Sequence, residues 1–396
     1  MGCRIAIDFA PGKDYPARMK PEPMPKGKAR YIMIGGFLGA GKTTAVAGLA
    51  QWLTEKGLRV GLITNDQGAQ LVDTVMLSAR GFPVEEIPGG CFCCRFNSLV
   101  EAARRLTQQN RPEIFIAEPV GSCTDLVATV SYPLRRIYGE DFSIAPLSVL
   151  VDPVRAGRVH GLSAGGKFSD KVLYIYRKQL EEADLIVINK CDLLDADSLS
   201  VLRTALALQY PQARIFEVSA RTGAGLAAWF ATITTTDQAP RAIMEVDYDS
   251  YADGEARLGW LNGTLQLAAR QPMDVNQLLQ RLATEIQRRL NDASVEVAHL
   301  KMTLEPNSGL GDLGIANLVR NDFVPELSQP LLDPFESGQL TLNLRAEGTP
   351  AVLRGAVSAS VEACLRLYPE LTATWEHLEC FKPGKPAPTH RMSASS

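Results

Sequence analysis

The chain has 396 residues, of which 46% are hydrophobic and 21% charged, and its formal net charge is −3. These values are ordinary for a globular chain of two or three domains; the near-neutral balance argues against nucleic acid or an anionic membrane as a partner, and no apolar run approaches the roughly 18–20 residues of a membrane span. The N-terminus lacks a signal-peptide layout, so we expect a cytoplasmic protein whose eight cysteines stay reduced.

Prolines crowd residues 16–25, which predicts a flexible N-terminal extension over residues 1–29. From residue 31 to residue 236, apolar strand candidates alternate with helical patterns, which predicts an α/β domain whose mostly parallel sheet is flanked by helices and binds ligands at the carboxyl ends of its strands. The predicted strands are 31–34, 60–64, 84–87, 114–117, 147–151, 185–188 and 215–218. The predicted helices are 42–56, 98–109, 125–137, 171–182, 198–209 and 226–233.

Residues 243–381 have a different rhythm, in which long strand patterns are separated by two amphipathic helices at 275–290 and 351–368. The order strand, helix, strands, helix, strand predicts a smaller C-terminal α+β domain of the split βαβ, ferredoxin-like type. The remainder, 382–396, begins with a segment rich in proline and lysine and is predicted to be a flexible tail.

The stretch Gly36–Thr43 fits the phosphate-loop pattern G-x-x-x-x-G-K-[ST], and it lies between the first predicted strand and the first predicted helix. Glycines let backbone N–H groups approach phosphate oxygens, and the helix N-terminus adds partial positive charge. Lys42 would reach the β- and γ-phosphates, and the Thr43 hydroxyl would ligate Mg²⁺. The alternative is a plain glycine-rich turn. The predicted phosphate-binding residues are Gly36, Gly39, Gly41, Lys42, Thr43 and Thr44.

A second motif, N-K-x-D, follows the predicted strand 185–188 and comprises Asn189, Lys190 and Asp192. An Asp carboxylate there accepts two hydrogen bonds from guanine that adenine cannot donate, which selects GTP over ATP. Ser219 and Ala220 follow the next strand, where a second base-contacting loop would lie. The alternative is a loop capped by Asn and Asp.

Two further strand ends carry candidate switch residues. Glu118 ends the strand pattern at 114–117 and would contact Mg²⁺ or its water shell, while the Gly121 N–H would sense the γ-phosphate; both join Lys42 and Thr43 as candidate catalytic residues. The alternative is an ordinary strand-to-helix turn, because carboxylates often lie near helix starts. Residues 65–68, which include Asp66, are a comparable candidate for a mobile switch loop, and a polar turn explains them almost as well.

Three thiols crowd into four positions at Cys91, Cys93 and Cys94. Thiolates are the soft ligands that Zn²⁺ and similar metals prefer, and a closed structural zinc site needs about four ligands. This loop supplies three at most, so the fourth position is open or is filled by Asp66, Cys123, a partner protein or water. An open site suits metal transfer more than storage, and the alternative is a buried cysteine-rich turn without metal.

These motifs, at 36–43, 91–94, 118–121 and 189–192, resemble those of the CobW-type P-loop GTPases in identity and order. That family is related to the urease, hydrogenase and methylmalonyl-CoA mutase accessory GTPases. The resemblance makes residues 31–236 a GTPase domain with a C-x-C-C metal loop, and residues 251–260 resemble the start of the family's C-terminal domain. The family's switch loop usually reads N-E-x-G, whereas this chain has Asp66 at the acidic position and no His-rich stretch.

The resemblance implies a slow, Mg²⁺-dependent GTPase that binds Zn²⁺ or Co²⁺ through its C-x-C-C cysteines and delivers the ion to a client metalloprotein; a homodimer stays open. The alternative is a regulatory GTP-binding module that gates assembly or cofactor loading of a partner enzyme, for example a corrinoid-dependent one, with structural cysteines. A metabolic kinase is disfavoured because the N-K-x-D motif indicates guanine.

Overall fold

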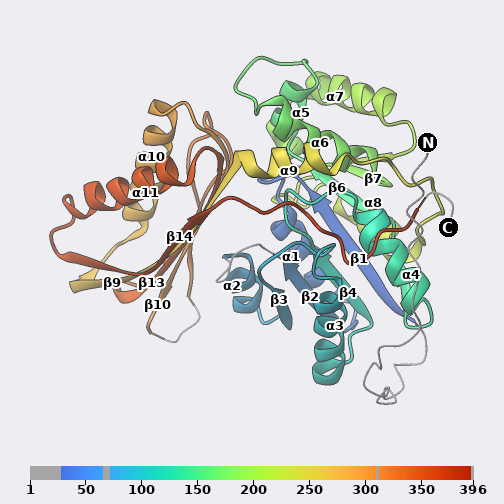
Figure 1. Ribbon diagram of the computed structural model, residues 1–396. Coiled ribbons are helices and arrows are strands. Elements are labelled where there is room, and N and C mark those ends of the chain that lie inside the picture. The colour runs from blue at the N-terminus through green and yellow to red at the C-terminus, as the bar shows by residue number, and fades with distance from the viewer. Residues whose placement is uncertain (1–27, 66–71, 309–311, 394–396) are drawn as a thin grey trace.

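The computed structural model describes residues 28–65, 72–308 and 312–393, so that Asp66 and the extension up to residue 27 lie outside the described residues. Two bodies lie side by side: an α/β domain and, coloured yellow to red, a smaller C-terminal domain (Figure 1). No helix in the described ranges combines the length and the apolar character that crossing a membrane requires.

The first domain is built on an eight-stranded sheet with the order β3-β2-β4-β1-β6-β7-β8, in which β5 also pairs with β1. All of its pairings are parallel, which confirms the predicted fold class. The central strands are buried on both faces, which is why they read as continuous apolar runs. The strands are β1 (Ala29–Gly36), β2 (Val60–Asn65), β3 (Val84–Ile87), β4 (Ile114–Glu118), β5 (Phe142–Ile144), β6 (Ser148–Val151), β7 (Leu185–Ile188) and β8 (Arg214–Glu217).

Helices cover both faces of this sheet. One hydrophobic cluster contains residues of α1 and α8, and the other contains residues of α3, α4 and α6. The helices are α1 (Lys42–Thr54), α2 (Val72–Ala79), α3 (Phe96–Asn110), α4 (Tyr132–Tyr138), α5 (Pro153–Val159), α6 (Asp170–Glu181), α7 (Ala196–Gln209) and α8 (Leu226–Thr235). The single helix predicted at 125–137 is wrong in detail: a π-helical turn at Val127–Ser131 precedes α4. Pro133 explains part of the difference, because it has no N–H for a regular helical hydrogen bond.

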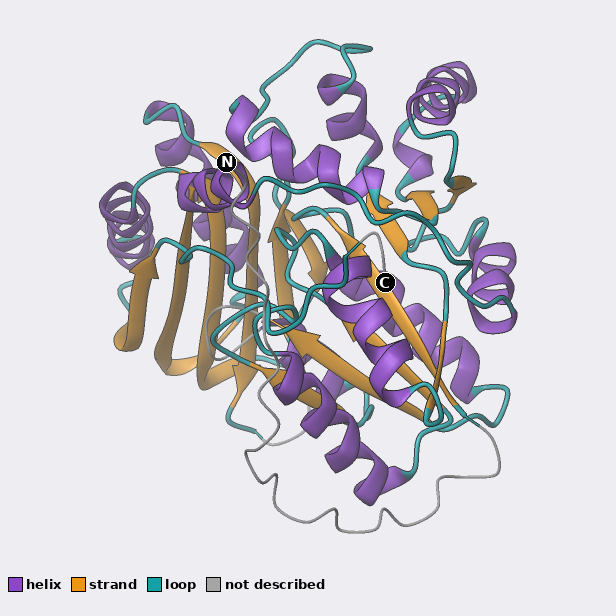
Figure 2. Ribbon diagram, turned by 45° about the vertical axis from the view of Figure 1, so that its right-hand side comes forward, coloured by secondary structure: helices purple, strands orange, loops and turns teal. Residues whose placement is uncertain are grey.

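The C-terminal domain contains a six-stranded antiparallel sheet with the order β12-β11-β10-β13-β9-β14. The strands β10, β13, β9 and β14, together with α10 and α11, have the predicted ferredoxin-like order, and the hairpin β11-β12 extends the sheet at the β10 edge. Figure 2 shows these strands beside the first domain. The elements are α9 (Tyr248–Arg257), β9 (Leu258–Met273), α10 (Asn276–Asp292), β10 (Glu296–Pro306), β11 (Gly314–Leu318), β12 (Glu326–Gln329), β13 (Phe335–Glu347), α11 (Pro350–Leu365) and β14 (Leu371–Phe381).

The two faces of this second sheet differ in chemistry. Leu300, Met302 and Leu304 of β10 belong to the hydrophobic cluster that also contains the apolar sides of α10 and α11. The alternate residues His299 and Thr303 are polar and buried as well. Because successive side chains of a strand point to opposite faces, the polar residues form the face away from α10 and α11.

Candidate nucleotide and metal site

The turn between β1 and α1 has the backbone that a phosphate loop needs. Gly36 and Gly41 have φ angles of +127° and +91°. A Cβ atom at Gly36 would lie 2.3 Å from the Leu150 carbonyl oxygen, and one at Gly41 would lie 2.4 Å from Asn189 Nδ2. Only glycine fits both positions, and the turn therefore presents its N–H groups and the first turn of α1 to the same space.

Three oxygen-bearing side chains meet at the start of α1. The Thr43 hydroxyl lies 2.6 Å from Asp73 Oδ1 and 3.0 Å from Glu118 Oε1. Glu118 Oε2 is buried without a hydrogen-bond partner among the described residues. Burial, reinforced by the charge of Asp73, raises the pKa of Glu118 to about 7. A cluster of hard oxygen ligands with one carboxylate oxygen unsatisfied fits a divalent cation such as Mg²⁺.

The N-K-x-D residues are tied to the phosphate loop. The Asn189 amide donates to the Ala40 carbonyl at 2.8 Å and accepts from the Ala220 N–H at 2.9 Å, so one side chain joins the phosphate loop to the second predicted base loop. Lys190, held at a φ of +55°, donates to the Gly39 carbonyl at 2.7 Å. The Asp192 side chain is exposed, as a carboxylate that receives a base must be.

The three clustered cysteines form one group of sulfur atoms, all within 4.8 Å of one another. The Cys91 sulfur lies 2.7 Å from that of Cys93 and 3.2 Å from that of Cys94, and the Cys93 and Cys94 sulfurs are 3.7 Å apart. Three sulfurs at about 2.3 Å from one tetrahedral zinc ion would be separated by about 3.8 Å. The group therefore fits a thiolate-bound ion if the Cys91 sulfur moves away from the other two sulfurs until their separations reach about 3.8 Å.

A fourth thiol approaches this group from the switch segment. Cys123 is fully buried and lies outside the three-sulfur group, but its thiol is close enough to Cys91 to lower the pKa of that residue. Hydrogen bonds from Cys123, Cys93 and Cys94 hold the pKa of Cys91 well below its usual range, which favours the thiolate form that binds metals. Cys123 lies two residues after Gly121, where an added Cβ would be 2.9 Å from Lys42 Nζ. A short segment thus reaches from the side chain of Lys42 to the sulfurs.

Residues 382–393 differ from the predicted flexible tail, because they lie in extended form against the cysteine loop. The Thr389 N–H donates to the Cys93 carbonyl at 2.8 Å, and the Thr389 hydroxyl donates to the Cys94 carbonyl at 3.0 Å. Arg391 Nε donates to the buried carboxylate of Asp125 at 2.7 Å. Main-chain pairing and a partly buried ion pair hold this segment, and neither is visible in its composition.

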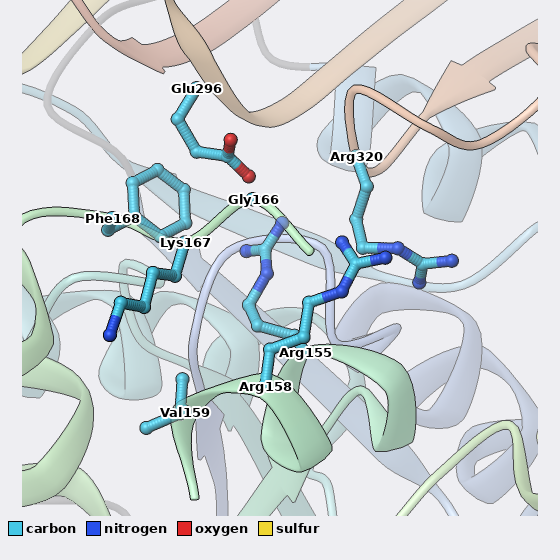
Figure 3. Close-up of a pocket in the computed structure, with 8 residues that line it drawn as sticks. All are labelled: Arg155, Arg158, Val159, Gly166, Lys167, Phe168, Glu296 and Arg320. Atoms are coloured by element: carbon cyan, nitrogen blue, oxygen red, sulfur yellow. The ribbon is translucent and has the colours of Figure 1, made fainter. Parts of the chain in front are cut away.

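Arg155 joins the phosphate loop to the C-terminal domain. Its guanidinium donates to the Leu38 carbonyl at 2.8 Å and to the Val319 carbonyl at 2.6 Å. Arg320 of the C-terminal domain forms a buried ion pair with Asp152 at 3.0 Å. Figure 3 shows both arginines beside the small cavity at this junction. The C-terminal sheet is therefore in direct contact with the nucleotide site.

The structure brings the predicted site residues into two adjoining groups. Phosphate-loop residues meet Glu118 and Gly121 on one side and the two base loops on another, and the sulfurs lie at the end of the 118–123 segment. Thr44 is exposed on α1. Sequence reasoning missed Asp73 and Lys301, because α2 was not predicted and because an isolated lysine 258 positions from Thr43 carries no motif.

A strand, a glycine turn and a helix that cradle phosphate, together with a base loop on the same sheet edge, define the class of P-loop nucleotide-binding proteins. Residues 30–217 match the family model for the CobW/HypB/UreG nucleotide-binding domain. The match covers slightly less than half of the chain, and this part is therefore similar to that nucleotide-binding domain.

The chain is similar to three curated relatives over part of their length. It is 32% identical over 200 residues to the zinc chaperone CobW of a Sinorhizobium species (45% of this chain, 55% of the relative). It is 27% identical over 180 residues to the zinc chaperone YeiR of Escherichia coli K12 (44% and 50%). It is 23% identical over 217 residues to the zinc-regulated GTPase metalloprotein activator 1 of Dictyostelium discoideum (48% and 45%). The chain thus spans about half the length of these relatives.

Two solved structures are similar at low scores. The hydrogenase maturation factor HypB from Archaeoglobus fulgidus has a TM-score of 0.35 at 21% identity, with 52% of this chain and 88% of that chain covered. Zn(II)-bound YjiA GTPase from E. coli has a TM-score of 0.36 at 17% identity, with 84% and 99% covered.

Proposed function

We propose that this chain is a GTP-hydrolysing metallochaperone, which binds Mg²⁺ and GTP in its first domain and delivers Zn²⁺ or Co²⁺ from its cysteine loop to a client metalloprotein. The observation that carries the proposal is the 118–123 segment, because it begins at the oxygen cluster, passes Lys42 at Gly121 and ends at the sulfur group at Cys123. We place the protein in the cytoplasm, where the reducing environment keeps such thiols free of disulfide bonds.

In the proposed reaction, water attacks the γ-phosphorus of GTP, the bond to the β-phosphate oxygen breaks, and GDP and phosphate form. Thr43, Asp73 and Glu118 would hold Mg²⁺, which neutralises phosphate charge when bound. Lys42 and the N–H groups of the glycine turn bind the β- and γ-phosphates, and Asp192 orients the guanine. Loss of the γ-phosphate removes the contact at Gly121, so the segment that carries Cys123 is free to shift.

The coupling in this proposal is reciprocal. If GTP tightens ion binding by about tenfold, the ion tightens GTP binding by the same factor, which corresponds to about 1.4 kcal/mol in either direction. Thiolates accept several soft ions, so the identity of the cargo depends on which ion responds to nucleotide. In the proposal, Zn²⁺ and Co²⁺ both bind to the same three cysteines.

The test is a competition titration against a chromophoric zinc chelator, with GDP or a non-hydrolysable GTP analogue bound. We expect the metal affinity to differ by about tenfold or more between the two nucleotides. Replacing Cys91, Cys93 and Cys94 together by serine should abolish tight metal binding and leave GTP binding in place. Cys364→Ser, at a buried thiol in the second domain, is the matched control. Equal metal affinities with both nucleotides would contradict the coupling.

One observation favours the second candidate, a regulatory GTP-binding module with structural cysteines. Residues 382–393 cover the cysteine loop, as they would over an ion that stays in place. A structural ion should remain through GTP hydrolysis in the presence of a chelator, whereas a cargo ion should leave. Elemental analysis after a single turnover separates the two functions.

A further inference from the structure

The polar face of the C-terminal sheet is buried against the nucleotide site. A Cβ atom at Gly39 of the phosphate loop would lie 2.9 Å from the Ala298 carbonyl of β10. The Val72 N–H at the start of α2 donates to Asn343 Oδ1 of β13 at 3.1 Å. A sheet that only capped the first domain would be expected to bury apolar side chains there. Buried polar groups at this contact instead indicate a role in the site.

One residue of this face enters the oxygen cluster. Lys301 Nζ lies 2.5 Å from Asp73 Oδ1 and 3.2 Å from Thr43 Oγ1. Burial opposes ionisation of Asp73, but the charge and hydrogen bond of Lys301 hold the pKa of that carboxyl below its usual value. The ammonium group therefore neutralises the carboxylate that would otherwise help to bind a divalent cation.

Lys301 and Lys42 both lie near the oxygen cluster at the start of α1. Burial lowers the pKa of Lys42; the negative charge of Glu118 opposes this shift, and the positive charge of Lys301 adds to it. The carboxylates of Glu118 and Asp73 offset the repulsion between the two ammonium groups while they are not bound to a cation. When Thr43, Asp73 and Glu118 bind a divalent cation, that cation competes with Lys301 for the same oxygens. The γ-phosphate is the anion that the phosphate loop would place within reach of an ammonium group displaced from these oxygens.

We propose that Lys301 is a further catalytic residue, supplied to the GTPase site by the C-terminal domain. In the nucleotide-free chain it pairs with Asp73, and in the GTP-bound chain it contacts the γ-phosphate and stabilises the charge that develops there during hydrolysis. GDP has no γ-phosphate and therefore offers Lys301 no such contact. The C-terminal sheet thereby distinguishes GTP from GDP. The inference rests on the proposed function, because it requires GTP in this site.

A purely structural role for the ion pair between Lys301 and Asp73 predicts a different result. If Lys301 only joined the two domains, its removal would weaken GTP and GDP binding alike, since the domain contact is made with either nucleotide. A γ-phosphate contact affects GTP alone. The comparison of the two nucleotides therefore decides between these roles.

The experiment compares Lys301→Met, which keeps most of the stem, with Lys301→Arg, which keeps the charge. The matched control is Lys171→Met, because Lys171 forms an exposed pair with Asp253 at 2.9 Å between α6 and α9. We expect Lys301→Met to lose about tenfold or more in affinity for a GTP analogue and about 100-fold in single-turnover rate, with GDP affinity within about twofold of wild type. The Arg variant should recover part of both losses, and the control should match wild type.

An equal loss for GTP and GDP, or no loss for either, would overturn the inference. A wild-type chain that binds no GTP would instead refute the proposed function. A second measurement needs no variant: a GTP probe with an acyl group on the γ-phosphate transfers that acyl group to a contacting lysine Nζ, and GTP leaves. Mass spectrometry should find the acyl group on Lys301 as well as Lys42. Its absence from Lys301 while Lys42 is labelled would contradict the γ-phosphate contact even if Lys301→Met does not fold.

Discussion

The backbone N–H of Ala387 donates a hydrogen bond to the Sγ atom of Cys94 at 3.2 Å. Cys94 is the least buried of the three clustered thiols, so the C-terminal segment covers the side from which an ion or a client thiol would approach. The ring of His390 packs edge-on against Phe96 at 5.0 Å and holds the segment next to this loop. Access to the sulfurs thus depends on residues almost 300 positions away in the sequence.

Deleting residues 382–396 should speed metal exchange. The deletion removes the hydrogen bonds that Ala387 and Thr389 donate to Cys93 and Cys94 but leaves all three thiols in place. We therefore expect faster loss of bound Zn²⁺ to a chelator, by about tenfold, with GTP affinity unchanged. Stopped-flow chelation measures the rate. Lys385→Ala, which removes only the exposed pair with Asp249, is the control. An unchanged rate in the deletion variant would show that the segment does not limit access.

Asp192→Asn should change the base specificity. The carboxylate is expected to accept hydrogen bonds from guanine, whereas an amide presents a donor where guanine also has one. GTP affinity should fall by about 100-fold, and xanthosine triphosphate, which has a carbonyl oxygen at that position, should bind better than GTP. Fluorescence titration with both nucleotides measures the change, and Asp197→Asn, on α7, is the control. Parallel losses for both nucleotides would argue against a base contact at Asp192.

The sequence predicted the elements with local signals. The strands 84–87 and 185–188 agree with β3 and β7 residue for residue. The strand β7 is buried and reads as a short apolar run, whereas β3 lies at the edge of the sheet and keeps two glutamates between its apolar ends. The helix α5 was missed, because its seven residues include Gly157 and are too few to show a helical repeat of apolar residues. The contacts of Lys301 and of Ala387 with the site depend on how distant segments pack, and that information is absent from any local pattern.

Arg155→Ala should loosen the contact between the two domains. The fully buried guanidinium bonds the Leu38 and Val319 carbonyls and lies over the Phe168 ring at 5.0 Å. Its removal leaves those carbonyls without a donor, so we expect a loss of about 3–5 kcal/mol in the free energy of unfolding. Arg158→Ala, on the same helix, removes a mostly buried side chain that pairs with the exposed Asp322, so it should cost less than Arg155→Ala, about 1–2 kcal/mol. Urea unfolding measures both, and losses of similar size would contradict the special role of Arg155.

Glu182 should make the nucleotide-free protein less stable as the pH rises. Burial raises the pKa of its carboxyl to about 8, even though the Thr124 hydroxyl and the Val127 N–H both donate to it. The folded chain therefore holds a proton that the unfolded chain releases at its ordinary, lower pKa. Stability is fully present below that ordinary pKa, falls as the pH rises towards about 8, and is then constant, because only in this window does the folded state bind more protons.

Glu182→Gln removes this titration, so its melting temperature should fall less than that of the wild type between about pH 5 and about pH 8. Glu181→Gln is the matched control, because the neighbouring carboxylate of Glu181 is half-buried and pairs with Lys178. Calorimetry of the three proteins over this pH range measures the difference. Parallel curves for wild type and Glu182→Gln would show that Glu182 is already ionised in the folded chain, and that the segment from Thr124 to Val127 is held by a carboxylate instead of a neutral acid.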